Sequence, residues 1–495
     1  MSTTSNIDIT LSKEGGFKRS LGLFDGVMLV TGIVIGSGIF LTSAEITRTV
    51  GGMGWVFVVW IVAAFMTIIG ALCYGELAAL FPHAGGQYVY LRRAYNPLVG
   101  FLYGWAFFAV IQCGSIAAVA VAFSKYLSFI FPVLGENHFL LEVGDFHISF
   151  SQGIAILLIV LLTFINTKGV KNGKLIQGVF TVAKVLAIFL LIIFGFWWAN
   201  NTGVWQANWT DPWKIFHHDA IRKGNDVIGY TDAISAHGID VIGLVCVAMV
   251  GSLFTNTGWN NLTYIAAEVK RPHKNIGRSL LLGTLLVTVI YLLCNAMYMS
   301  VLTMQDIAFA QSDRVAAVTA NVILGSFGAV AIAMLIMVST FGSDNGLILS
   351  GPRVYYSMAE HKLFFRKVGR LNKSGVPAYG LWIQCVWASI LCLSGRYSDL
   401  LSYVIFVEVL FYMLTIGGIF ILRKRLPDQE RAYKAPGYPV LPAIYILLAV
   451  IICLALVIYR PLYTWPGLII IVLGLPVYYF VLKKGRGSAG KEKGI

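Results

Sequence analysis

The stretch "VTGIVIGSGIF", residues 30–40, places Gly32, Gly36 and Gly38 inside the first apolar segment of the chain. Each glycine weakens a helix by about 1 kcal/mol relative to alanine. Irregular backbone at membrane depth survives only where protein or a polar cavity covers it. The stretch therefore predicts either unusually close helix packing or a binding site at a broken helix.

The composition predicts an all-α polytopic membrane protein. Of the 495 residues, 58% are hydrophobic and 12% are charged, and the mean hydropathy is +0.77. Soluble domains have about 25% charged residues, and a membrane-spanning helix needs about 20 apolar residues. Twelve apolar stretches of that kind lie near 23–44, 55–80, 98–124, 148–167, 175–199, 241–267, 279–303, 315–346, 377–395, 400–422, 440–459 and 463–482.

The net charge of +14 reflects membrane topology and contact with lipid headgroups, not nucleic-acid binding. If the N-terminus is cytoplasmic, most of the 37 lysines and arginines fall in inner segments, as the positive-inside rule requires. We therefore expect both termini in the cytoplasm and a multi-pass protein in the plasma membrane or a bacterial inner membrane. The first apolar run reads as a span and not as a cleavable signal.

A second weak point occurs in the sixth span, which reads "VGSLFTNTGWNNL" at 250–262. Thr255, Asn256, Thr257 and Gly258 are poor helix formers in succession. The two breaks lie five spans apart, and an odd number of spans reverses the direction in which a repeat enters the membrane. Paired broken helices in an inverted repeat mark a transporter's binding site, whereas small residues alone indicate close packing.

The two breaks suit the two ends of an α-amino acid. The half-helix after Gly36–Gly38 begins with free N–H groups and a positive dipole end, which favour a carboxylate. Ser37 can add a hydroxyl donor. The half-helix that ends near Phe254 presents carbonyls, which favour an ammonium. Because no acidic residue lies beside either break, we expect neutral substrates, although Glu408 in the tenth span weakens this expectation if it faces the cavity.

Lys184, in "FTVAKVLAIF" at 180–189, is the most informative charge. It lies near the middle of the fifth span, where ionisable residues are costly and usually functional. Its ammonium is predicted to occupy a place where a related carrier would hold a sodium ion. Two alternatives are a transported-proton site and a purely structural lysine held by carbonyls. Phe254 can likewise be a gate over the substrate or an ordinary packing residue.

Other classes of function find little support. The histidines lie in predicted loops or at span ends without metal-like spacing, so we expect neither a metal, another cofactor nor a membrane-embedded enzyme. No channel filter motif is present. All seven cysteines lie in apolar stretches, so an external disulfide is not expected.

The chain resembles the amino acid–polyamine–organocation superfamily, and within it the L-type amino-acid transporters and their bacterial relatives. The resemblance covers nearly the whole chain. It is carried by "IVIGSGIF" at 33–40, "ALCYGEL" at 71–77, "GGQYVYL" at 85–91, "GWNNLTYIAAEVKRPHKNI" at 258–276, "RKRLPDQERAYKAPGYPVLP" at 423–442, and Lys184 at the span-five lysine of sodium-independent members.

The resemblance implies a LeuT-like fold of twelve helices, with a five-plus-five inverted repeat, broken helices 1 and 6, and alternating access. It implies that Phe254 is an aromatic gate and that substrate is bound by Ile35, Gly36, Ser37, Gly38, Ile39, Phe254, Thr255 and Gly258. The organisation we expect is an N-terminal tail (1–20), a first repeat (21–200), an extracellular loop (201–239), a second repeat (240–423), helices 11 and 12 (424–482) and a C-terminal tail (483–495).

The predicted function is a sodium-independent transporter of neutral L-amino acids, working by exchange. The alternative is a proton-coupled amino-acid importer with Lys184 as the proton site. Mammalian relatives pair with a glycoprotein through a cysteine between spans three and four. Because the loop at 131–150 has no cysteine, we expect this chain to work without such a disulfide-linked heavy chain.

Overall fold

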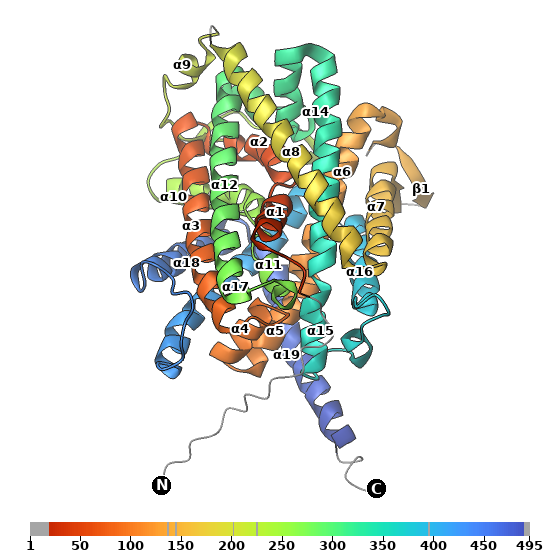
Figure 1. Ribbon diagram of the computed structural model, residues 1–495. Helices are drawn as coiled ribbons and strands as arrows, with labels where there is room; N and C mark the ends of the chain where they lie inside the picture. The colour runs from red at the N-terminus through yellow and green to blue at the C-terminus, as the bar shows by residue number, and fades with distance from the viewer. Residues whose placement is uncertain are drawn as a thin grey trace.

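The computed structural model describes residues 19–135, 138–143, 146–200, 202–223, 226–394 and 397–489. Residues 1–18 of the predicted N-terminal tail and 490–495 of the predicted C-terminal tail lie outside this range. The described part of the chain is a bundle of helices with short strands in the connecting loops (Figure 1).

Every apolar stretch predicted as a span contains a helix. The first is divided into α1 (Leu23–Val34) and α2 (Gly38–Val50). The others are α3 (Met53–Leu80), α5 (Pro97–Ala106) with η1 (Phe107–Gln112) and α6 (Cys113–Ile130), α7 (Phe150–Thr167), α8 (Val170–Ala199), α10 (Ile239–Thr255), α12 (Pro272–Val301), α14 (Val315–Ser350), α16 (Ala378–Ser394), α17 (Tyr397–Arg425), α18 (Val440–Tyr459) and α19 (Pro461–Ala489).

Length and composition agree with membrane insertion. In the described chain, eight helical segments are long and apolar enough to cross a bilayer, and α1 with α2 forms one further span bent by 43°. The helices α10 and α16 and the Thr464–Phe480 part of α19 are shorter and also apolar. Together these segments account for the predicted spans.

The shorter elements lie at the ends of the bundle. α4 (Gln87–Ala94) and α15 (Pro352–Glu360) lie near one end, and α9 (Val204–Asn208) lies at the other (Figure 1). The remaining short helices are α11 (Asn261–Tyr264), α13 (Met304–Ala308), η2 (Pro132–Leu134), η3 (Ala266–Glu268), η4 (Gln311–Asp313) and η5 (Arg366–Gly369).

The loops at 131–150 and 201–239 contain strands that the sequence did not predict. β1 (Phe139–Val143) pairs with β2 (Phe146–Ser149), β4 (Ala220–Lys223) with β5 (Asp226–Tyr230), and β3 (Phe216–His217) with β6 (Ile234–Ser235), all antiparallel. Each pair is only a two-stranded hairpin. The span-forming architecture therefore remains entirely helical.

Helices that lie five spans apart in the chain pack against each other, as expected of a five-plus-five inverted repeat. α3 packs against α12, α6 against α14, and α7 against α16. These are the second and seventh, third and eighth, and fourth and ninth spans. Each helix thus contacts the one that lies five spans further along the chain. The two broken spans also meet, because α2 packs against α10.

The breaks arise where the backbone leaves the helical conformation. α1 ends at Val34 because Ile35 has φ −72° and ψ 79°, which is not helical. α10 ends at Thr255, and Gly258 follows with φ +87°. A β-carbon at Gly258 would also lie 2.7 Å from Cγ2 of Ile33. Glycine is required at this position both by the conformation and by the close approach of α1.

A buried ion-pair cluster fastens the segment before α18 to the bundle. Glu76, at the end of α3, is only 2% exposed. Its carboxylate accepts hydrogen bonds from Arg423 at 2.6 and 2.9 Å and from the main-chain N–H of Ala435 at 2.7 Å. Arg431 lies 3.3 Å from the same carboxylate. Glu76 thus has a structural role at the end of its span.

Candidate functional site

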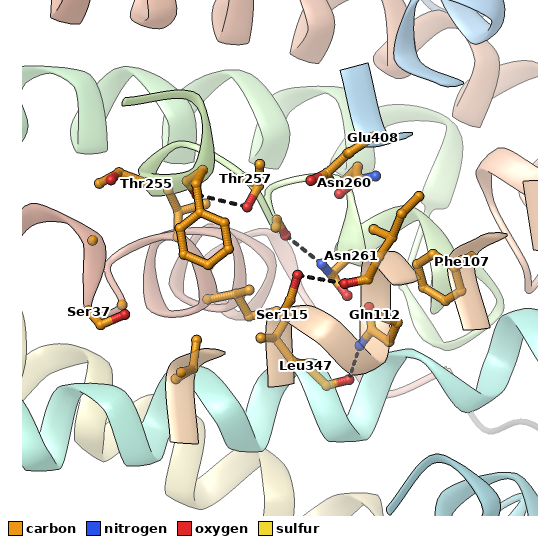
Figure 2. Close-up of a pocket in the computed structure, with 18 of the residues that line it drawn as sticks. Ser37, Phe107, Gln112, Ser115, Thr255, Thr257, Asn260, Asn261, Leu347 and Glu408 are labelled. Atoms are coloured by element: carbon orange, nitrogen blue, oxygen red, sulfur yellow. Dashed lines mark hydrogen bonds between the residues drawn. The ribbon is translucent and has the colours of Figure 1, made fainter. Parts of the chain in front are cut away.

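A cavity of about 500 Å³ lies between the two broken helices (Figure 2). Six of the eight residues predicted to bind substrate line it: Gly36, Ser37, Gly38, Phe254, Thr255 and Gly258. The other lining residues are Ile33, Val34, Phe107, Ile111, Gln112, Ser115, Val119, Thr257, Asn260, Asn261, Tyr264, Leu347 and Glu408. The predicted residues Ile35 and Ile39 are fully buried and do not line the cavity.

The start of α2 forms one wall of the cavity. Gly36, Ser37 and Gly38 line it where α2 begins. The first N–H groups of a helix have no acceptor within the helix, and they carry its positive dipole end. The amide of Gly36 donates to Val34 O at 2.7 Å, and the amide of Phe40, one turn later, donates to Ser37 O at 3.1 Å. The geometry at this wall suits a carboxylate.

Gly38 also lies at a close contact between the two broken spans. A β-carbon at Gly38 would lie 2.8 Å from Cβ of Thr255 and 2.9 Å from its Cα. Thr42, one turn along α2, donates to Gly38 O at 2.9 Å and lies 3.1 Å from Oγ1 of Thr255. Gly38 therefore allows close helix packing and also lines the cavity.

The end of α10 differs from the sequence-based expectation of free carbonyls. Phe254 O accepts from the N–H and the hydroxyl of Thr257, at 3.0 and 2.8 Å. Thr255 O accepts from the hydroxyl of Tyr291 at 3.1 Å. A carbonyl oxygen has two lone pairs. Both are used at Phe254 O, so an ammonium here would use the second lone pair of Thr255 O.

Tyr291 joins the two interrupted helices. Its hydroxyl lies 2.7 Å from Val34 O, at the end of α1, and 3.1 Å from Thr255 O, at the end of α10. The side chain is 1% exposed and comes from α12. The sequence gave no sign of this role, since a tyrosine in an apolar span belongs to no motif.

Lys184 lies directly behind the break in the first span. Its Nζ donates to Gly32 O at 2.6 Å, Ile35 O at 2.7 Å, Ser343 Oγ at 2.9 Å and Ser339 O at 3.0 Å. The side chain is 1% exposed. An ammonium on α8 thus connects α1 with α14 through a shell of oxygen atoms.

The third span supplies cavity residues that the sequence did not predict. Its middle section, η1, is a π-helix, and such insertions are frequent at functional sites. Phe107, Ile111 and Gln112 from this section line the cavity. Gln112 Nε2 donates to Leu347 O at 2.6 Å and so holds η1 against α14. A π-helix leaves no pattern in hydrophobic periodicity by which it could have been found.

Two asparagines that follow the break in span six also line the cavity. Asn261 donates to Gly258 O at 3.0 Å and accepts from the hydroxyl of Ser350. Asn260 donates to the hydroxyl of Tyr264 at 2.7 Å. Both lie in the "GWNNL" part of the motif that carried the family resemblance, which is the signal that pointed to this segment.

Glu408, which the sequence left as a possible cavity residue, does line the cavity, and this weakens the expectation of neutral substrates alone. It comes from α17, is 5% exposed, and lines the cavity together with Asn260 (Figure 2). Because α17 is the tenth span, its approach to the sixth is a long-range contact that sequence spacing does not reveal. Among the described residues, no three His, Cys, Asp or Glu side chains are grouped as metal ligands.

The chain matches a sequence profile described as "Amino acid permease" over residues 21–480. It is 29% identical to the human large neutral amino acids transporter small subunit 2 over 464 residues, which is 93% of this chain and 80% of the relative. It is 28% identical to the serine/threonine exchanger SteT of Bacillus subtilis (strain 168) over 476 residues, covering 96% of this chain and 99% of that protein.

A third relative is the human b(0,+)-type amino acid transporter 1, which is 26% identical over 95% of this chain and 89% of its own length. The similarity extends through both broken helices and through Lys184. The fold, the paired breaks and these alignments lead to one conclusion. The chain belongs to the amino acid permease family of the amino acid–polyamine–organocation superfamily, in the branch of the L-type amino-acid transporters.

Proposed function

We propose that the protein is a sodium-independent exchanger of neutral L-amino acids that works by alternating access. The observation that carries the proposal is the cavity between α1–α2 and α10–α11, into which helix ends of opposite polarity open. A zwitterion is the small molecule whose two charges match such ends. The names of the relatives, which include a neutral amino acid transporter and a serine/threonine exchanger, support the same substrate class.

In this proposal the α-carboxylate binds at the start of α2. Its donors are the amides of Gly38 and Ile39, in the first turn of α2, and the hydroxyl of Ser37. The amides of Ile35 and Gly36 donate to Thr31 O and Val34 O, so these two residues shape the wall without donating to the carboxylate. The α-ammonium binds at the carbonyl ends of α10 and α1, with Thr255 and Gly258 shaping that end. Phe254 lines the cavity and is 6% exposed, and we assign it the role of an aromatic gate.

Lys184 supports the sodium-independent part of the proposal. Four oxygen acceptors within 3.0 Å surround its Nζ, including two carbonyls at the break of the first span. An oxygen shell of this kind is what a bound sodium ion would require, and here a fixed ammonium occupies it. A neutral amine has only two N–H groups for these four acceptors, so the surroundings favour the fixed-charge role over a transported proton.

We further propose that the protein is a multi-pass cell-membrane carrier with both termini in the cytoplasm, as the distribution of lysine and arginine favours. Some relatives are named small subunits of larger transporters. The loop before α7 has no cysteine for a disulfide to another chain. We therefore expect the chain to act without a disulfide-linked heavy chain.

The test is uptake of labelled L-serine or L-leucine into proteoliposomes that contain the purified protein. Uptake is expected only when the vesicles are preloaded with unlabelled amino acid, and its rate should be the same in sodium and choline buffers. Uptake into empty vesicles driven by a pH gradient would instead support proton-coupled import. Uptake that requires sodium would contradict the proposed role of Lys184.

A further inference from the structure

Glu408 is a buried acid that the zwitterion site does not use. Its side chain is 5% exposed. One carboxylate oxygen, Oε1, accepts a hydrogen bond from the hydroxyl of Tyr412, one turn further along α17, at 2.5 Å. The other, Oε2, has no hydrogen-bond partner among the described residues. Buried polar atoms normally have a hydrogen-bond partner, so this oxygen is an exception.

Glu408 lies on the far side of the cavity from the carboxylate seat. Figure 2 shows Ser37 and Glu408 at opposite ends of the group of labelled residues, with Thr255 and Thr257 between them. Glu408 also lines a small neighbouring cavity, together with Asn256 and Tyr412. The side chain of an amino acid seated with its carboxylate at the start of α2 can therefore be directed toward Glu408, which lines the same cavity.

No cation in the described cavity wall balances this carboxylate. The lining residues include no lysine, arginine or histidine. The titratable groups that interact electrostatically with Glu408 are tyrosine hydroxyls, which are neutral and do not balance its charge. They come from several helices: Tyr74, Tyr103, Tyr264, Tyr412 and Tyr445. Lys184 donates to the far side of α1 and does not line the cavity. A buried carboxylate without a counter-charge favours a cationic ligand.

We infer that Glu408 is a specificity-determining residue that lets the carrier accept amino acids with a cationic side chain in addition to neutral ones. The terminal ammonium of such a side chain supplies the donor that Oε2 lacks, while the zwitterion site holds the common part of the molecule. The inference rests on the proposed function, because it takes this cavity as the substrate site.

The experiment measures competition against exchange of labelled L-serine or L-leucine, whichever exchanges faster, in preloaded proteoliposomes. The competitors are L-lysine and 6-hydroxy-L-norleucine, which has a hydroxyl in place of the ammonium of lysine. In the wild type, lysine should inhibit at least about tenfold more strongly than its hydroxyl analogue, which corresponds to about 1.4 kcal/mol. Equal inhibition, or none by lysine, would overturn the inference without any variant.

Glu408→Gln then tests whether this residue is the cause. The ratio of the two inhibition constants should fall toward one, whatever happens to the absolute rate. A matched control is Glu360→Gln, which removes the charge of a glutamate that accepts the same kind of one-turn hydrogen bond, from Tyr356 at 2.8 Å, on α15 outside the cavity. This control should keep the wild-type ratio. An unchanged ratio in Glu408→Gln would contradict the inference.

The failure of this inference and that of the proposed function are distinguishable. If neither neutral amino acid exchanges in the wild type, the proposed function fails. If neutral exchange proceeds and lysine does not compete, only the role of Glu408 fails. Should Glu408→Gln not fold, Glu408→Asp preserves the charge, and it is expected to keep a preference for lysine over the hydroxyl analogue.

Discussion

Gly38 shows how one residue serves both the fold and the site. Its amide belongs to the proposed carboxylate seat, and its missing side chain lets α2 approach Thr255 on α10. At Gly36, by contrast, a β-carbon would meet Ser343 at 3.5 and 3.6 Å, an ordinary contact. The packing against α10 therefore requires glycine at position 38, whereas a side chain at position 36 has space.

Gly38→Ala should destabilise the protein by about 1–3 kcal/mol, because the added methyl group overpacks the contact with Thr255. Gly36→Ala should change stability much less. Thermal unfolding in detergent, followed by tryptophan fluorescence, measures both. Equal melting temperatures for the two variants would mean that the close contact between α2 and α10 is not formed as described.

Lys184 is the residue on which sodium independence depends. Lys184→Ala removes the ammonium from a shell of four oxygen atoms and with it the hydrogen bonds of a charged donor, which are worth about 1.5–3 kcal/mol each. Exchange should fall by at least about tenfold. The comparison variant Lys125→Ala removes a lysine that does not line the cavity. Exchange by Lys184→Ala at the wild-type rate would refute the assignment.

At the level of elements, Tyr291 ties together the two helix ends that must move in alternating access. Its hydroxyl bonds both Val34 O and Thr255 O. Tyr291→Phe keeps the ring and removes the one hydroxyl proton that the two carbonyls share, and a hydrogen bond of this kind is worth about 0.5–1.5 kcal/mol. We expect a folded protein with an altered exchange rate, measured in preloaded vesicles. A rate and a melting temperature that both match the wild type would show that the bridge has no role.

The contact between α4 and α15, at one end of the bundle, should respond to pH. His361 follows α15, and its Nδ1 lies 3.3 Å from the hydroxyl of Tyr88 on α4. Burial, reinforced by the nearby charge of Arg92, lowers the pKa of His361 from 6.5 to about 4. Since the folded state favours the neutral ring, this contribution is complete above about pH 6.5 and is lost as the pH falls toward about 4.

The measurement is the melting temperature of wild type and His361→Gln at about pH 7 and about pH 5. Both proteins lose stability from their carboxylates on acidification, so the difference between them isolates His361. The wild type should lose more than the variant. A parallel decrease in the two proteins would exclude the histidine as the cause.

At the scale of the whole molecule, the sequence predicted the fold well because each span is a local signal. Every predicted apolar stretch contains a helix, and the glycines at 36 and 38 and at 258 mark the breaks. The lysine at 184 could be predicted as a candidate functional residue because a charge inside an apolar span is conspicuous. Residues contributed by helices distant in the sequence were missed, because nothing in a single span indicates which face meets the cavity.

Tyr291 and Gln112, which were missed, and Glu408, whose orientation stayed open, illustrate this limit. Each lies on a different helix, and each becomes part of the site only through the packing of the two repeats. The strands of the loops were missed for a related reason, since hairpins of two to five residues per strand give little periodic signal. The family resemblance predicted the architecture. The side chains that distant helices bring to the site became known only from the contacts between those helices.

The central claim is that two interrupted helices hold a zwitterion by their main-chain ends. Its most direct test is competition against labelled exchange by L-leucine, L-leucine methyl ester and N-acetyl-L-leucine. The ester lacks the carboxylate and the acetyl derivative lacks the ammonium, while the side chain is unchanged. The account predicts that only free L-leucine competes, and competition by either derivative at the strength of L-leucine would contradict it.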